Sequence, residues 1–70
     1  MTITEEITWI KEQLAGLETP IRQQTILLKA YKAGGESTKD AFDKTSSVLG
    51  GLLAAKESFE EDLKAAEAQS

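Results

Sequence analysis

The side chains in this sequence that could together do acid–base or metal chemistry are the carboxylates close to its C-terminal end. They are Glu57, Glu60, Glu61, Asp62 and Glu67. General acid–base catalysis needs a carboxyl group in an apolar pocket that raises its pKa. Calcium loops need converging oxygens in an Asp-x-Asp-x-Asp-Gly pattern, which this sequence lacks. We expect these acids to face water, and the sequence predicts neither a catalytic nor a metal site.

The rest of the composition excludes most other catalytic chemistry. There is no Cys and no His, so a thiolate nucleophile, an imidazole base, a zinc finger and a disulfide framework are excluded. Gly34 and Gly35 are not followed by the Lys-Ser/Thr of a phosphate-binding loop. We therefore expect no enzyme activity, no cofactor and no small-molecule substrate.

Length and charge limit the class of protein and its partners. The chain of 70 residues is at most one domain, residues 1–70, and a domain this short buries only about 60% of its unfolded surface, so alone it is marginally stable. Eight Lys and Arg against twelve Asp and Glu give a net charge of −4. That balance argues against direct binding of nucleic acid, which needs clustered Lys and Arg.

Two targeting signals are missing from the sequence. No apolar stretch approaches the ~20 residues that span a membrane. The first residues lack the basic and apolar regions of a signal peptide. We expect a protein that is not secreted, located in the cytoplasm or within a soluble assembly.

Apolar residues recur with a heptad period in two long segments, which is typical of helices that pack along a seam. With positions lettered a to g, the a and d residues of the first segment are Ile3, Ile7, Ile10, Leu14, Leu17, Ile21, Gln24, Leu28 and Tyr31. Those of the second are Phe42, Thr45, Leu49, Leu52, Lys56, Phe59, Leu63 and Ala66.

The spacing predicts an all-α fold, an antiparallel two-helix coiled-coil hairpin. Its first arm covers residues 3–33, its Gly-rich turn residues 34–36, and its second arm residues 37–68. Thr2 or Thr4 is expected to cap the first arm, and Ser37 the second. We expect the hairpin to assemble further into a helical bundle.

Pro20, Gly50 and Gly51 interrupt the helical pattern, and folding the chain about the turn places them at one height. Pro20 either bends the first arm or ends it, in which case Thr19 caps a new helix and the chain has three helices. Gly50 and Gly51 form either a hinge or a site of close helix approach. We favour a shared bend or close approach over two unrelated interruptions.

Several apolar residues lie outside the a and d seam. They predict that the chain contacts a second copy of itself or another protein. They are Trp9, Ile26, Leu27, Val48, Leu53 and Ala55. Gln24 and Lys56 are polar residues within the seam. Gln24 is a candidate for fixing register, whereas Lys56 is expected to direct its ammonium group outwards.

Charge is distributed unevenly along the expected rod. Residues 1–18 and residues 56–70 each have a net charge of −3, and residues 19–55 have +2. The two termini meet at one end of a hairpin, so that end is acidic and the turn end is mildly basic. The acidic end carries Glu57, Glu60, Glu61, Asp62 and Glu67.

These observations predict a structural or scaffolding protein, a small oligomerising subunit of a larger assembly. A virion or another macromolecular machine is a candidate setting, on base rates alone. The alternative is a small acidic inhibitor or adaptor that places its acidic end in a basic groove on a partner protein.

Overall fold

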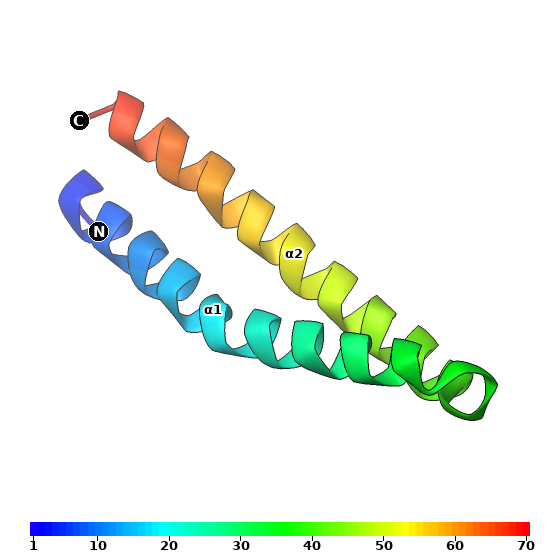
Figure 1. Cartoon of the computed structure of the whole chain (residues 1–70). Coiled ribbons are helices and arrows are strands. Elements are labelled where there is room, and N and C mark those ends of the chain that lie inside the picture. Colours follow the sequence, from blue (N-terminus) through cyan, green and yellow to red (C-terminus); the bar gives the residue numbers. More distant parts are fainter.

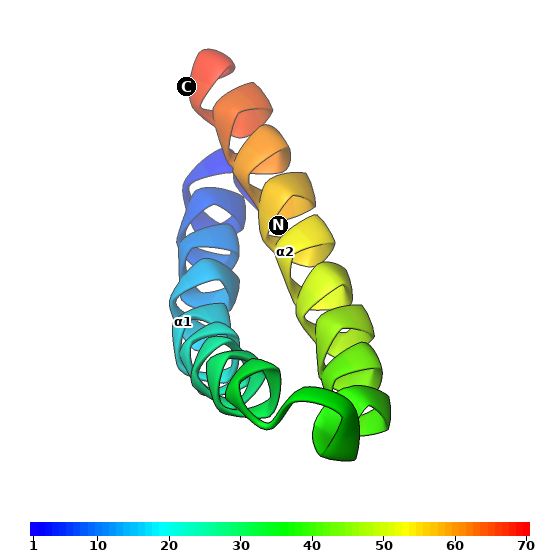
Figure 2. The same cartoon turned by 45° about the vertical axis from the view of Figure 1, so that its right-hand side comes forward.

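The computed structural model describes all 70 residues, and the chain forms a helical hairpin. Helix α1 spans Ile3–Ala33, the short 3-10 helix η1 spans Gly35–Thr38, and helix α2 spans Lys39–Ala68. The two long helices run side by side in opposite directions, with both termini at one end (Figures 1 and 2). The rod measures 51 × 15 × 14 Å. The predicted all-α hairpin is confirmed.

The start of α1 is fixed by a capping box. The Thr2 hydroxyl accepts a hydrogen bond from the Glu5 backbone N–H at 3.2 Å, and the Glu5 carboxylate accepts one from the Thr2 backbone N–H at 3.3 Å. These bonds satisfy two backbone donors that an unprotected helix end leaves free. Of the two expected caps, Thr2 is therefore the one used.

The turn is closed by hydroxyl groups that bond the end of α1. The Thr38 hydroxyl donates to the Tyr31 carbonyl, and the Ser37 hydroxyl donates to the Gly34 carbonyl at 2.9 Å. Gly35 has φ +63°, a left-handed conformation that L side chains rarely adopt. The prediction that Ser37 caps the second arm is wrong: η1 occupies this stretch, and α2 begins at Lys39 with Thr38 in the cap position.

Helix α1 bends but does not break. It runs unbroken through Pro20, so the three-helix alternative is wrong. The helix changes direction near its middle, in the cyan stretch of Figure 1, whereas α2 shows no comparable change. Pro20 lacks the N–H that would bond the Gly16 carbonyl, and a missing helical hydrogen bond is an ordinary cause of a bend.

Gly50 and Gly51 do not mark a close approach of the two helices. No atom outside the local backbone lies within 4 Å of where a side-chain Cβ would stand at either residue. The predicted close approach opposite Pro20 is therefore wrong, and so is the expectation that both arms bend together there. The seam passes on the other side of α2 at this height, through Leu49 and Leu52.

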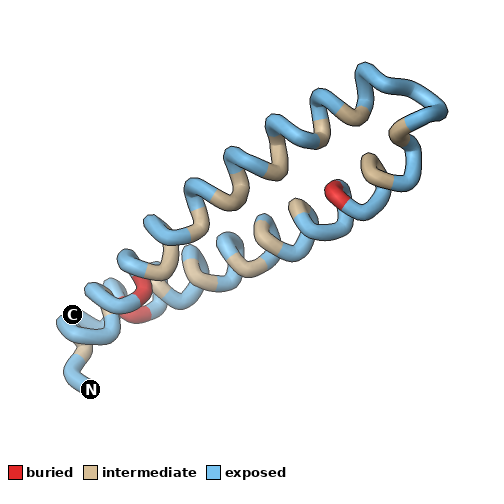
Figure 3. Tube along the Cα trace, turned by 90° about the horizontal axis from the view of Figure 1, so that it is seen from below, coloured by how far each residue is buried: buried red, intermediate tan, exposed pale blue.

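The core is a narrow line between the helices. Residues that are buried or half-buried recur along the inner sides of α1 and α2, and the outer sides are exposed (Figure 3). They include every predicted a and d residue except Lys56. Only Ile10, Thr45 and Ala66 are buried, and no large side chain is completely enclosed.

The glycines allow a test of this fold with one chemical change at two places. Gly50→Ala adds a methyl group in open space and should stabilise the helix by about 1 kcal/mol. Gly35→Ala forces an L residue into the left-handed region and should destabilise by about 1–2 kcal/mol. Urea unfolding at one fixed protein concentration measures both. Equal effects of the two substitutions would contradict the turn geometry.

Candidate interaction surfaces

The hairpin has two broad sides that differ in chemistry. Because antiparallel helices are related by an approximate two-fold axis, equal heptad positions of α1 and α2 lie on the same side of the seam. Position a is occupied by Ile7 and every seventh residue after it in α1, and by Phe42 and every seventh residue after it in α2. Positions g and c of both helices make one side, which we call the g/c face: Glu6, Trp9, Gln13, Gly16, Pro20, Gln23, Leu27 and Ala30 of α1, and Ala41, Lys44, Val48, Gly51, Ala55, Ser58, Asp62 and Ala65 of α2. Positions e and b make the other side, the e/b face.

The g/c face is apolar or small over most of its length. Its only charged residues are Glu6, Lys44 and Asp62. Trp9, Leu27 and Val48 are 46%, 39% and 51% exposed on it. Pro20, Ala41 and Ala55 are half-buried along the same side.

The Trp9 indole ties the g/c face to the core. Its ring lies 5.8 Å from the Phe59 ring, centroid to centroid, at an interplanar angle of 71°. An edge-to-face pair of this kind adds about 0.5–1.5 kcal/mol beyond the area that it buries. Trp9 is therefore held in place by α2 while nearly half of its side-chain surface remains open to a partner.

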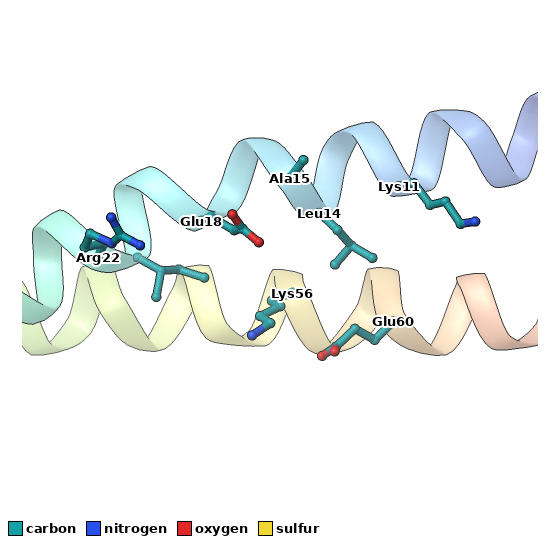
Figure 4. A pocket seen from close by; sticks show the side chains of 8 residues that line it. Lys11, Leu14, Ala15, Glu18, Arg22, Lys56 and Glu60 are labelled. Carbon is teal, nitrogen blue, oxygen red and sulfur yellow. The ribbon is translucent and has the colours of Figure 1, made fainter.

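The e/b face carries most of the charge and an open groove. Lys11, Leu14, Ala15, Glu18, Ile21 and Arg22 of α1 line this groove of about 570 Å³ together with Lys56 and Glu60 of α2. Leu14 and Glu18 are directed towards α2, but the charged end of Lys56 points away from α1 (Figure 4). Lys56 occupies an a position and is exposed, so the seam lacks an apolar side chain there. The groove follows from that interruption.

The acidic residues near the C-terminus divide between the two faces. Glu57, Glu60, Glu61 and Glu67 surround a second groove of about 470 Å³ that also contains Leu14, Leu63 and Lys64. Asp62 occupies a g position and lies on the g/c face instead. No three or more carboxylates converge closely enough to hold a metal ion. The predicted acidic end is thus an apolar strip with a carboxylate rim on one side of the molecule.

The residues predicted for self-association do not form one surface. Trp9, Leu27, Val48 and Ala55 lie on the g/c face. Ile26 is at position f, 60% exposed, beside that face, and it shares a shallow depression with Leu27, Gln23 and Gln24. Leu53 is 46% exposed at position e, on the opposite side. The separation of Leu53 from the others follows from its heptad position and was therefore predictable from the sequence.

Sequence reasoning missed the groove residues Lys11, Glu18 and Arg22. Their positions, e and b, place them beside the a position that Lys56 fails to fill. A charged residue at an a position was therefore the available signal, because it predicts both a gap in the seam and the side on which the gap opens. An outward-pointing lysine at this position accounts for the exposed charge but does not by itself predict the groove.

Comparison with known proteins identifies no relative. No protein-family model, no curated protein and no solved structure matches this chain. Neither helix contains a segment long and apolar enough to cross a membrane.

Filling the gap at Lys56 should strengthen the seam. Lys56→Leu places an apolar side chain opposite Leu14 and Ile21, and we expect the free energy of unfolding to rise by about 1 kcal/mol. The matched control, Lys64→Leu, makes the same change at an exposed b position and should leave stability unchanged. Urea unfolding compares the two. A gain from Lys64→Leu but not from Lys56→Leu would contradict the origin assigned to the groove.

Proposed function

We propose that this protein is a non-enzymatic structural subunit that assembles with copies of itself through apolar surface that the hairpin leaves uncovered. The proposal rests on the amount of surface that the chain exposes. A monomeric globular protein of 7.6 kDa exposes about 4,300 Å², and this chain exposes 5152 Å². The excess, about 850 Å², is close to the ~800 Å² that each partner contributes to a standard protein interface.

The small core supports the same proposal. Three of 70 residues are buried, and no large side chain is fully buried. Two helices with so few buried groups offset little of the conformational entropy of ordering a chain of this length, so a lone hairpin would be marginally stable. Association stabilises the folded form by mass action, because it binds only the folded chain.

Sedimentation equilibrium tests the proposal directly. Over a protein concentration range of about 1–100 µM we expect dimers or larger species that increase with concentration. Because the contacts are apolar, they should persist in about 0.5 M NaCl, where the Debye length is only a few ångströms. A cooperatively folded strict monomer across this range would contradict the proposal.

A second function is supported by the acidic groove on the e/b face. The sequence predicts an acidic end that enters a basic groove on a partner. Because the glutamates surround a groove on this chain, we propose instead an adaptor or inhibitor that binds a basic amphipathic segment of another protein in that groove. The groove offers Leu14 and Leu63 to apolar side chains, and four glutamates around it to Lys and Arg. This arrangement resembles helix-in-groove recognition with a charged rim.

Salt and charge removal test the alternative. A synthetic Lys- and Leu-rich amphipathic peptide should bind at low salt and lose most of its affinity in about 0.5 M NaCl. Replacing Glu57 and Glu60 by Gln should weaken binding about 10-fold, from the loss of two charge contacts. The control is the double variant Glu5→Gln and Glu12→Gln, both at position f of α1, and it should not weaken binding. Titration calorimetry measures the affinities, and salt-independent binding would contradict the proposal.

A further inference from the structure

We propose that the g/c face binds the g/c face of a second copy of this chain, with the two hairpins antiparallel, to form a four-helix bundle. This inference rests on the proposed function, because it identifies the surface and the orientation of the self-association. Lone apolar residues elsewhere on the rod do not enter it.

The surface that the hairpin leaves uncovered matches what a second copy would cover. The rod is 51 Å long, so a second hairpin can pack along its whole length. The chain exposes about 850 Å² more than a globular protein of its mass, and each partner in a standard interface contributes about 800 Å². A second hairpin packed along the full length would therefore cover the surface that a protein of this size normally does not expose. Use of one patch by both copies is the usual arrangement in a two-fold dimer.

The distribution of charge on the g/c face is that of an interface. Its middle, from Gln13 to Leu27 on α1 and from Val48 to Ser58 on α2, has no charged residue at the g and c positions. Glu6, Lys44 and Asp62 lie towards the ends. Interfaces are depleted of charge at their centre and polar at their rim, whereas the e/b face has charged residues along its whole length.

Pairing across an antiparallel dimer sets large residues against each other. In this dimer a two-fold axis runs across both rods at their mid-height. It packs α1 on α1 of the second copy and α2 on α2 of the second copy. A residue on one side of the middle of a helix therefore faces the residue equally far on the other side in the second copy. Trp9 and Leu27 each lie nine residues from residue 18, the middle of α1. Trp9 of one protomer would therefore meet Leu27 of the second copy, twice in the dimer. Both side chains are partly exposed in the single hairpin.

The charged residues of the face distinguish the two possible orientations. The middle of α2 falls between residues 53 and 54, and Asp62 and Lys44 lie on opposite sides of it, each about nine residues away. In the antiparallel dimer Asp62 therefore faces Lys44 of the second copy. In a parallel dimer α2 would pack on α1 of the second copy, and the seam register, with Lys56 between Leu14 and Ile21, would place Asp62 near the uncharged Trp9 and Gln13 instead of near Lys44. Unlike charges therefore favour the antiparallel arrangement.

Two glutamate substitutions test the face. In sedimentation equilibrium, Val48→Glu buries a charge in the dimer and should raise the dimer dissociation constant at least about 100-fold. Leu53→Glu makes a comparable change at similar exposure on the e/b face, and should alter it less than about 3-fold. If Leu53→Glu dissociates the dimer and Val48→Glu does not, the face is wrong while the proposed function stands. A monomeric wild-type chain would overturn both.

Charge reversal tests the orientation of the two hairpins. It also tests the use of the g/c face if Val48→Glu fails to fold. Asp62→Lys should raise the dissociation constant about 5- to 30-fold, because two unlike pairs become like pairs. Addition of Lys44→Asp should restore the wild-type value. The control, Glu61→Lys at position f, makes the same charge change away from the face and should have little effect. An unchanged or tighter dimer with Asp62→Lys would contradict the pairing of Asp62 with Lys44 and overturn the inference.

Discussion

The structure depends on one constraint: each helix has a single neighbour. Two helices touch along a line, so a side chain at position a or d is covered from one direction and open on its flank. This explains why residues such as Leu17 and Leu49 are only half-buried although they lie in the middle of the seam. In a four-helix bundle each helix packs against two others, and the same positions close completely. Two copies of the hairpin are therefore the smallest number that could give each helix a second neighbour.

The interruptions in the pattern act within this constraint. In a larger core, neighbours would compensate for a lysine at an a position, but here the exposed Lys56 opens a groove directly. Pro20 bends α1 without ending it, because seam residues on both sides of it still pack on α2. At Gly50 and Gly51 the space that a side chain would occupy is open. Irregularities that look alike in the sequence therefore have different structural results, which are set by the side of the helix on which each residue lies.

The sequence predicted those features that depend on period and on local chemistry. The heptads of both arms and the Thr2 cap are encoded within a few residues, and the structure agrees with them. The role of Ser37 was not predictable in the same way, because its hydroxyl can accept a hydrogen bond from an N–H group of α2 or donate one to a carbonyl group at the end of α1. In the structure Ser37 lies in the 3-10 helix that follows Gly34, and its hydroxyl donates to the Gly34 carbonyl. The contact of Trp9 with Phe59 was likewise not predictable, because it depends on how α1 and α2 are aligned along their length.

The two proposed activities use opposite sides of one rod, and this bears on how they could coexist. A dimer through the g/c faces would leave both e/b faces outward, each with its acidic groove near the open end. Antiparallel packing would place these grooves at opposite ends of the bundle, because each lies at the end where the termini meet. A basic partner could then bind at both ends without competing with self-association. Because apolar contact and charge are separated on the two sides, assembly need not neutralise the acidic surface available to a partner.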